Sequence, residues 1–406
     1  MCGDFLGVGH PYNTSGVYKY NRTGKNVDIY IADTGIFEGH DDFKDKKGNS
    51  RVITIYPDKD KMSSSAKNGD YYKDTHGTSV ASCAAGNICG VAKEANIFNV
   101  WVLHSGSGVI KGIDRVLEHH LNKNNCNPSI LNMSFGTRST TYLFHETKDL
   151  IENGVICLAC AHNYSEPIST APAVIPHVIS VGSASWDNKM ASHSNYGDTV
   201  DILAPGEHVK VARVDPDNRT KTNHYINYGS GTSYATPYTA GVLALIIQDS
   251  CIENEDDINK AKQLLYEYSR KNFIQVKGST PNRLIFSLVE NEPIKPRKYK
   301  VTVVQNSNTE TFCIEKGDTL TISLDIPDGY KLDTIEGDNP GGQHKNSKYY
   351  TNSITSNATY IFKYKKMNKP DKPEKPDKKD DSNSKLPIII IGLVTSALAL
   401  FATYKI

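Results

Sequence analysis

Short apolar runs alternate with longer, mixed segments along residues 26–292. The runs are rich in β-branched and small apolar residues, and they have the length and continuous hydrophobicity of buried parallel strands. They are Val27–Ala32, Ala95–Leu103, Ile130–Ser134, Gly154–Ala161 and Val178–Ser183. Helical segments lie between or after them, at Thr78–Ala85, Val109–Asn122, Tyr142–Asn153 and Ser233–Cys251. This alternation predicts an α/β fold with a doubly wound parallel sheet flanked by helices, in which ligands bind beyond the carboxyl ends of the strands.

The pattern changes after Pro293–Pro296. Residues 297–366 carry β-rich runs with period-two alternation in places, separated by turn residues. The runs are Tyr299–Val304, Thr319–Leu324 and Thr359–Tyr364. We therefore expect a small all-β domain, to which the sequence assigns no chemistry because its His, Cys and carboxylate side chains are not grouped.

The C-terminal part of the chain predicts a stalk and a membrane anchor. Residues 367–385 repeat Pro, Lys and Asp, a composition that buries no core and favours an extended spacer. Leu386–Tyr404 follows with 19 uncharged residues, close to the ~20 that cross a bilayer as a helix. Because the stalk separates this segment from any core, we expect a transmembrane helix rather than a buried one.

Charge and cysteines narrow the function classes. The 46 basic and 45 acidic residues give a net charge of +1, which offers no electrostatic argument for a nucleic-acid partner. Cys157 and Cys160 lie in an apolar run, where strand alternation places the two thiols on opposite faces. We expect packed core thiols there rather than a redox pair.

Three residues carry the signal for chemistry. Asp33 ends the first predicted strand, His76 opens His-Gly-Thr, and Ser233 lies in Gly-Thr-Ser-Tyr-Ala at the start of a helix. A serine hydroxyl is a weak nucleophile until an imidazole takes its proton and a carboxylate holds that imidazole in one tautomer. Each motif alone also fits an ordinary turn or helix start. Together, in this order, they predict nucleophilic catalysis by Asp33, His76 and Ser233.

The region of residues 26–289 resembles the subtilisin superfamily of proteases (the subtilases), and is most similar to its proteinase K-like branch. Four motifs carry the resemblance, in the same order: Val27–Gly35, His76–Thr78, Asn132–Gly136 and Gly231–Pro237. The resemblance implies a serine endopeptidase that acts on proteins or peptides and needs no cofactor for its chemistry. It also implies that the side-chain amide of Asn163 stabilises the oxyanion together with the Ser233 N–H.

The resemblance further implies how substrate binds, and one departure affects it. An extended peptide would lie between the edge formed by Gly106, Ser107 and Gly108 and the edge formed by Ser134, Phe135 and Gly136. His162 stands where the family has a glycine that lines the floor of the pocket for the side chain preceding the scissile bond. His162 therefore either narrows that pocket or favours acidic residues at low pH, when the imidazole is charged.

Two smaller departures leave activity intact. Ser79 replaces a second family histidine, at a position that supports the helix rather than the chemistry. Tyr234 replaces the methionine that usually follows the nucleophile, and we expect it to pack beneath the site.

Structural calcium is implied by the resemblance alone. The carbonyls of Pro172 and Val174 together with Asp201 match one proteinase K-type site, and such oxygens suit Ca²⁺. The alternative, Asp201 as an ordinary strand-end acid, stays open. No grouping of His and Cys indicates zinc.

The N-terminal segment, residues 1–25, contains no recognisable signal peptide, because Met1–Leu6 lacks a basic region and a long apolar run. We expect the natural start, with a signal and a pro-segment, to be missing. Glycosylation sequons, which a secretory route would use, occur at Asn13, Asn21, Asn132, Asn163, Asn218 and Asn357. Asn132 and Asn163 fall inside catalytic motifs, where we expect no glycan.

The sequence as a whole predicts a monomeric, membrane-anchored serine endopeptidase whose catalytic domain lies outside the cell or in a lumen. A cytosolic, tail-anchored enzyme is one alternative. The other is a catalytically inactive subtilase-fold adhesin or scaffold, against which the intact Asp33, His76, Asn163 and Ser233 argue.

Overall fold

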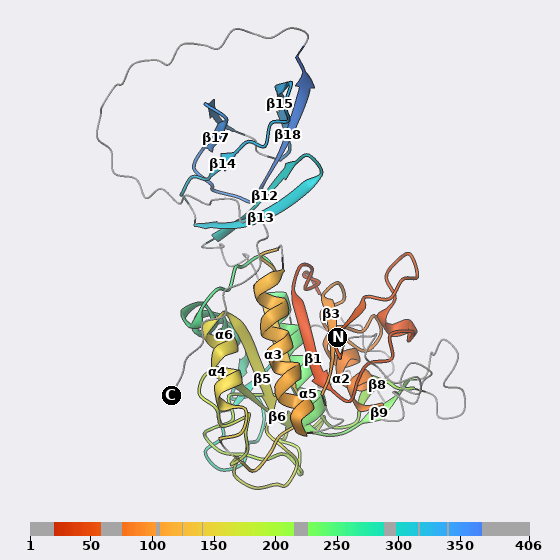
Figure 1. The fold of residues 1–406 in the computed structure, drawn as a ribbon. Coiled ribbons are helices and arrows are strands. Elements are labelled where there is room, and N and C mark those ends of the chain that lie inside the picture. The colour runs from red at the N-terminus through yellow and green to blue at the C-terminus, as the bar shows by residue number, and fades with distance from the viewer. Residues whose placement is uncertain are drawn as a thin grey trace, which may run out of the picture. The chain divides into compact units, whose positions relative to one another are not determined.

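The computed structural model describes residues 20–57, 75–102, 106–123, 125–139, 141–214, 226–287, 298–315, 317–338 and 341–367. The chain divides into two compact units, Met1–Arg297 and Lys298–Ile406, and each is described by itself (Figure 1). The predicted stalk after Met367 and the predicted transmembrane helix lie outside the described residues. Within the described residues, no helix is long and apolar enough to span a bilayer.

The first unit is built on a nine-stranded sheet in the order β10-β11-β7-β6-β5-β4-β1-β3-β2. Its strands are β1 (Asp28–Asp33), β2 (Val52–Tyr56), β3 (Asn96–Trp101), β4 (Ser129–Met133), β5 (Val155–Cys160), β6 (Ile179–Ala184), β7 (Ile202–Pro205), β10 (Arg270–Lys271) and β11 (Arg283–Leu284). Neighbouring strands are parallel except for β10 and β11, which are antiparallel. All residues of β1, β4, β5 and β6 are buried, as their continuous hydrophobicity predicts.

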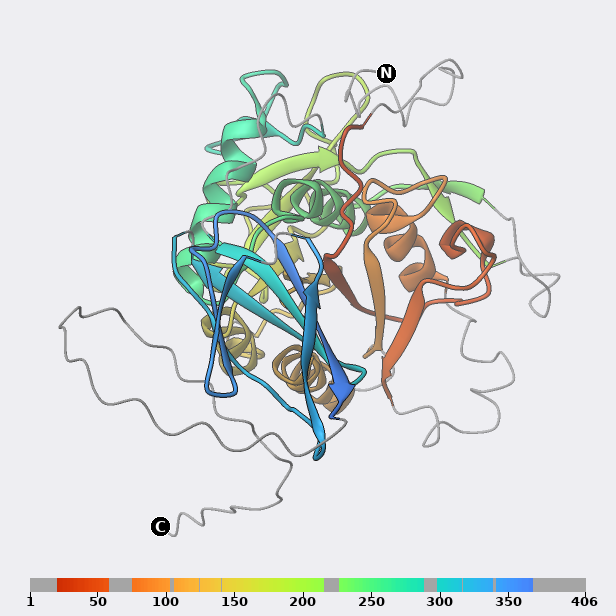
Figure 2. The same ribbon diagram turned by 90° about the horizontal axis from the view of Figure 1, so that it is seen from above.

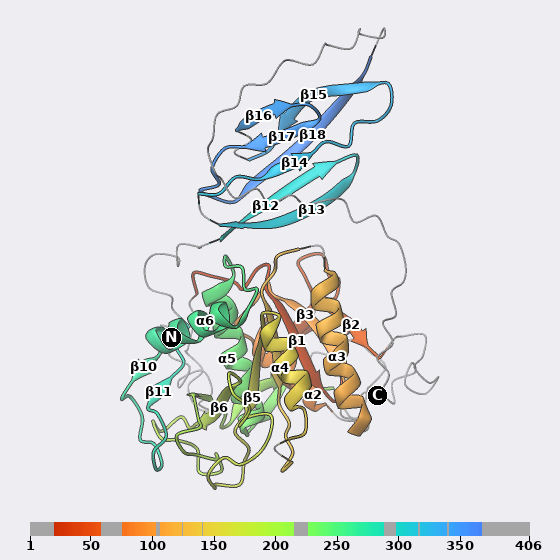
Figure 3. The same ribbon diagram turned by 60° about the vertical axis from the view of Figure 1, so that its left-hand side comes forward.

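Helices cover both faces of this sheet, so the predicted doubly wound α/β fold is confirmed. The helices are α2 (His76–Ala85), α3 (Gly106–Asn122), α4 (Phe144–Glu152), α5 (Thr232–Ile247) and α6 (Glu255–Tyr268). Figure 2 shows α2 and α5 on one face and α3 and α4 on the other. Helices α3 and α4 lie side by side (Figures 1 and 3). A separate antiparallel pair, β8 (Val209–Ala212) and β9 (Ile226–Gly229), leads into α5.

The strand order creates one crevice suited to a ligand. The chain passes from β1 to β2 and β3 on one side of β1, then crosses to β4 on its other side. At such a switch point, the connections leave a crevice beyond the carboxyl ends of the strands. Asp33 ends β1 and Ser134 follows β4, so both lie at this crevice.

The described part of the second unit contains β-strands, in keeping with the predicted β character. One sheet has the order β13-β12-β18-β15 and another the order β14-β17-β16. The strands are β12 (Lys298–Gln305), β13 (Asn308–Glu315), β14 (Thr321–Ser323), β15 (Tyr330–Glu336), β16 (Gly342–Lys345), β17 (Lys348–Thr351) and β18 (Ala358–Lys366). The unit has its own apolar core, which includes Val301, Tyr349, Tyr360 and Phe362.

Candidate active site

Asp33 and His76 form a hydrogen-bonded pair at the crevice. His76 Nδ1 donates to Asp33 Oδ1 over 2.8 Å, and the Thr34 N–H donates to the same oxygen over 2.7 Å. The Asp33 side chain is fully buried, whereas 28% of the His76 side chain is exposed. A proton held on Nδ1 by the carboxylate leaves Nε2 free to act as a base.

Glycine and threonine around His76 hold the start of α2 against the end of β1. A Cβ on Gly77 would lie 2.4 Å from the carbonyl oxygen of Gly35, so only glycine allows this approach. The Gly77 N–H donates to Thr34 Oγ1, and the Phe37 N–H donates to Thr78 Oγ1. The His-Gly-Thr pattern therefore fixes the position of the imidazole.

Ser233 is the second residue of α5, a helix whose other residues are all buried. Gly231 precedes the helix with a φ of 148°, a conformation that favours glycine. The ring of Tyr234 lies 5.8 Å from the His76 ring, centroid to centroid, and α2 packs against α5. These contacts bring the start of α5 close to the imidazole.

Pro237 explains an unexpected hydrogen bond at this helix start. Proline has no N–H, so the carbonyl of Ser233, four residues earlier, loses its partner within the helix. The hydroxyl of Ser134, beyond β4, donates to that carbonyl over 2.9 Å. Ser233 Oγ in turn donates to the Ser134 carbonyl over 3.3 Å. The two serine segments are thus tied together at the crevice.

Asn163 lies just beyond β5 with its amide oriented by Thr232. Asn163 Oδ1 accepts from the Thr232 N–H over 2.8 Å and from Thr232 Oγ1 over 3.1 Å. Because the oxygen takes both donors, the nitrogen Nδ2 faces the other way, 3.4 Å from the position of a Cβ on Gly231. The amide therefore lies against the start of α5, with its oxygen held by Thr232 and its N–H groups turned away from that residue.

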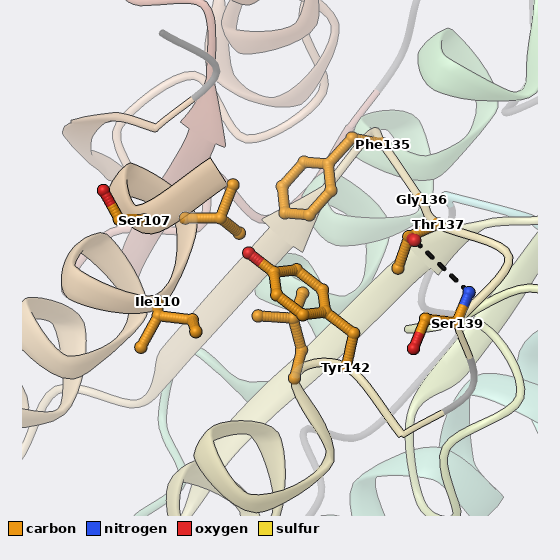
Figure 4. A pocket seen from close by; sticks show the side chains of 9 residues that line it. Ser107, Ile110, Phe135, Gly136, Thr137, Ser139 and Tyr142 are labelled. Carbon is orange, nitrogen blue, oxygen red and sulfur yellow. Dashed lines mark hydrogen bonds between the residues drawn. The ribbon is translucent and has the colours of Figure 1, made fainter. Parts of the chain in front are cut away.

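An apolar cavity of about 500 Å³ lies next to these residues (Figure 4). Its lining comes from α3, from the segment after β4 and from the approach to α4: Ser107, Val109, Ile110, Phe135, Gly136, Thr137, Ser139, Tyr142 and Leu143. The rings of Phe135 and Tyr142 and the side chain of Ile110 surround it. The predicted substrate residues Ser107, Phe135 and Gly136 thus line the same cavity.

One sequence expectation needs correction here. Gly106, Ser107 and Gly108 were expected to form an extended edge, but they form the first turn of α3. The hydrophobic residues that follow on that helix, Val109 and Ile110, line the cavity instead. The sequence offered one signal for this: Val109 and Ile110 begin the predicted helix immediately after Gly-Ser-Gly.

A model of the subtilase family matches residues 24–275. The chain belongs to the subtilase family. A crystal structure of a cold adapted subtilisin-like serine proteinase matches with a TM-score of 0.56 and 32% identity, over 68% of this chain and 93% of that one. The resemblance found in the sequence is therefore confirmed.

Two curated relatives match this subtilase over part of their length. A cuticle-degrading serine protease of Orbilia oligospora is 34% identical over 249 residues, which cover 59% of this chain and 54% of the relative. Alkaline serine exoprotease A of Vibrio alginolyticus is 32% identical over 279 residues, 67% of this chain and 47% of the relative. The chain spans about half the length of these relatives.

Asp201, one of the calcium ligands expected in this subtilase, has several partners within the protein. Asp201 Oδ1 accepts from Tyr266 over 2.5 Å and pairs with the Lys262 ammonium at 2.9 Å. Its Oδ2 accepts from the Ser180 N–H over 2.9 Å. The Pro172 carbonyl, another expected ligand, accepts from the Ile175 N–H. In this structure a lysine cation lies next to the Asp201 carboxylate, and the assignment of Pro172, Val174 and Asp201 as calcium ligands stays a prediction.

Ser79 and Tyr234, the two smaller departures from the family pattern, are structural in this subtilase. The buried Ser79 hydroxyl donates to the Ala212 carbonyl over 2.8 Å and ties α2 to β8. Tyr234 is 8% exposed and packs against Gly229, where a Cβ would lie 2.7 Å from its ring. Both side chains support the elements that carry His76 and Ser233.

Proposed function

We propose that this subtilase is a serine endopeptidase that hydrolyses peptide bonds of proteins through an acyl-enzyme. The observation that carries the proposal is the buried Asp33 carboxylate bonded to His76 Nδ1, next to the helix start that presents Ser233. Burying a carboxylate costs free energy, and a buried acid that orients a partly exposed imidazole is the arrangement that a general base requires.

Each residue has one task in the reaction. Ser233 Oγ attacks the carbonyl carbon of the scissile bond while His76 Nε2 takes the hydroxyl proton. The carbonyl oxygen becomes an oxyanion, to which the Asn163 amide and the Ser233 N–H donate. His76 then gives its proton to the leaving amine, and the C–N bond breaks. Water repeats the sequence on the ester, with His76 as base, and releases the acid.

The substrate is an extended protein segment. The apolar cavity of about 500 Å³ between Ser107 and Phe135 accepts a hydrophobic side chain, because such a pocket removes apolar surface from water. An extended backbone is required to reach both the cavity and Ser233. The enzyme therefore cuts flexible or unfolded segments.

The location of the enzyme is part of the same proposal. Residues 386–404 form a transmembrane helix, residues 367–385 a stalk, and the monomeric catalytic unit lies outside the cell or in a lumen. The length and the lack of charge of residues 386–404 support this arrangement. Glycans on the sequons outside the catalytic motifs would accompany it.

Active-site labelling tests the enzyme proposal. A fluorophosphonate probe should form a covalent adduct on Ser233, and the adduct should be absent in Ser233→Ala. Casein hydrolysis should fall at least ~10⁴-fold in that variant. A folded wild-type protein that takes no label would contradict catalysis and favour the inactive adhesin or scaffold.

The same probe in a membrane-impermeant form tests the location. Cells expressing the chain with its natural start should be labelled at Ser233 while intact. Labelling that appears only after lysis would reject the cell-surface location. Protection from the probe in sealed microsomes, relieved by detergent, would distinguish a lumenal enzyme from a cytosolic, tail-anchored one.

A further inference from the structure

His162 places an imidazole between two segments that flank the nucleophile. Residues 134–136 continue from β4 and residues 161–163 from β5, and these two strands are parallel neighbours. Ser233 Oγ bonds to the Ser134 carbonyl on one segment, and Thr232 bonds to Asn163 on the other. When the carbonyl of the scissile bond lies between Ser233 and Asn163, the side chain of the residue that carries this carbonyl must therefore enter the space between the two segments.

The imidazole crosses this space and reaches the opposite wall. A Cβ on Gly136 would lie 1.9 Å from His162 Nε2 and 2.7 Å from Cε1, so the tip of the ring rests against the Gly136 backbone. Nε2 is buried and has no hydrogen-bond partner among the described residues. The ring therefore fills volume here without being tied to a polar group of the described chain.

The position of the ring is set by its backbone and by a neighbouring aromatic ring. His162 has a φ of 73°, in the left-handed region that is unfavourable for a residue with a Cβ. Its ring stacks on Tyr164 with centroids 6.1 Å apart and an interplanar angle of 11°. A strained backbone that carries a bulky side chain at a catalytic crevice points to a role for that side chain.

Charge does not explain the histidine at neutral pH. Burial lowers the pKa of His162, and Glu166 opposes this shift. The imidazole is therefore mostly neutral near pH 7, which removes the cation that would attract an acidic substrate residue. The property of His162 that can select substrates at neutral pH is therefore the volume of its ring.

We propose that His162 restricts the residue on the N-terminal side of the scissile bond to glycine, alanine or serine. The inference rests on the proposed peptidase function and names its substrate class. Larger side chains need the volume that the imidazole fills, and forcing them in would displace the ring from Tyr164 and Gly136. Recognition of a large side chain is left to the separate cavity lined by Phe135 and Tyr142.

Matched peptides test this specificity. Two series, identical except for Ala or Phe directly before the scissile bond, are compared by kcat/KM. The wild-type enzyme should prefer Ala by ~10-fold or more. His162→Gly should raise kcat/KM for the Phe peptide by ~10-fold or more and shift the preference toward Phe. His162→Asn, which tolerates the left-handed backbone and is shorter, should lie between the two.

His177→Gly is the matched control. His177 also has a positive φ, of 66°, but it is partly exposed and pairs with Glu255 near α6. The Ala-to-Phe ratio should stay at the wild-type value in this variant. If removing any strained histidine had a general effect, the Ala-to-Phe ratio would change equally in His162→Gly and His177→Gly.

Three results would overturn the inference. They are a wild-type preference for Phe, an unchanged Ala-to-Phe ratio in both His162 variants, and a wild-type preference for Asp or Glu over Ala. Fluorophosphonate labelling separates these from failure of the proposed function, since the probe carries no peptide side chain. A labelled enzyme without the Ala preference refutes only the role of His162, whereas an unlabelled one refutes catalysis itself.

Discussion

At the residue scale, the crevice depends on side chains that hydrogen-bond to otherwise unpaired backbone groups, as well as on the side chains proposed to react. The Ser233 carbonyl is the example, because Pro237 removes its helical partner and Ser134 replaces it. Ser134 also accepts from the Asn132 amide over 2.9 Å, so one hydroxyl connects β4 to α5. The sequence contains both Ser134 and Pro237 in family motifs, but only the structure shows that one compensates for the other.

A double-mutant cycle tests this compensation. Ser134→Ala should lower the free energy of unfolding by about 1–3 kcal/mol, because a carbonyl loses its donor at a half-buried site. Pro237→Ala supplies a helical N–H to the same carbonyl, so the Ser134→Ala change should cost less in that background. Urea unfolding of the four proteins gives the coupling energy. Strictly additive effects would show that the two residues act independently.

At the element scale, the sequence predicts those parts whose pattern is local. Strands β1, β4, β5 and β6 are continuous apolar runs, and α5 is apolar all round, so their burial could be read directly. Helix α6 was missed, although Asn254 caps it by accepting from the Asp257 N–H. Its role could not be predicted, since the contact of Lys262 with Asp201 joins residues far apart in sequence. The calcium prediction from the family pattern could not take this ion pair into account.

The ion pair between α6 and the sheet provides the test at this scale. Lys262→Met should lower the free energy of unfolding by ~1 kcal/mol or more, because the Asp201 carboxylate loses its charged partner at a mostly buried site. Lys260→Met is the control, since its pair with Asp257 is exposed and such pairs contribute ~0–1 kcal/mol. Thermal unfolding measures both. A calcium-dependent rise in the wild-type Tm that Asp201→Asn abolishes would instead show calcium at this carboxylate.

At the scale of the whole catalytic unit, the sheet has two polar ends with different tasks. The crevice with Asp33 and Ser134 lies at the carboxyl ends of β1 and β4. The amino ends carry a buried network, in which the Lys123 ammonium bonds to Asp28 at 2.9 Å and to Ser129 Oγ at 2.7 Å. His120 joins it, with Nδ1 accepting from Ser129 Oγ and Nε2 donating to the Asn153 carbonyl. The network ties α3 to β1 and β4 and is built around a neutral imidazole.

The neutral imidazole makes stability depend on pH. Burial, with Lys123 nearby, lowers the pKa of His120 to about 4, whereas the unfolded chain has its ordinary value of ~6.5. Because the folded protein disfavours the proton, this contribution is complete above pH ~6.5 and is lost as the pH falls toward 4. The loss reaches at most ~3 kcal/mol at low pH.

The variant His120→Gln isolates this contribution. Glutamine supplies one donor and one acceptor but does not titrate. Urea unfolding of both proteins between pH 7.5 and pH 4 should show that the wild type loses more stability than the variant, with the difference appearing only below pH ~6.5. Burial also lowers the pKa of His119, His162 and His193, and these groups remain in both proteins, so they cancel in the comparison. A difference that stays constant across this pH range would show that His120 has the same pKa in the folded and the unfolded protein, so that the network accepts the proton beside Lys123 as readily as the unfolded chain does.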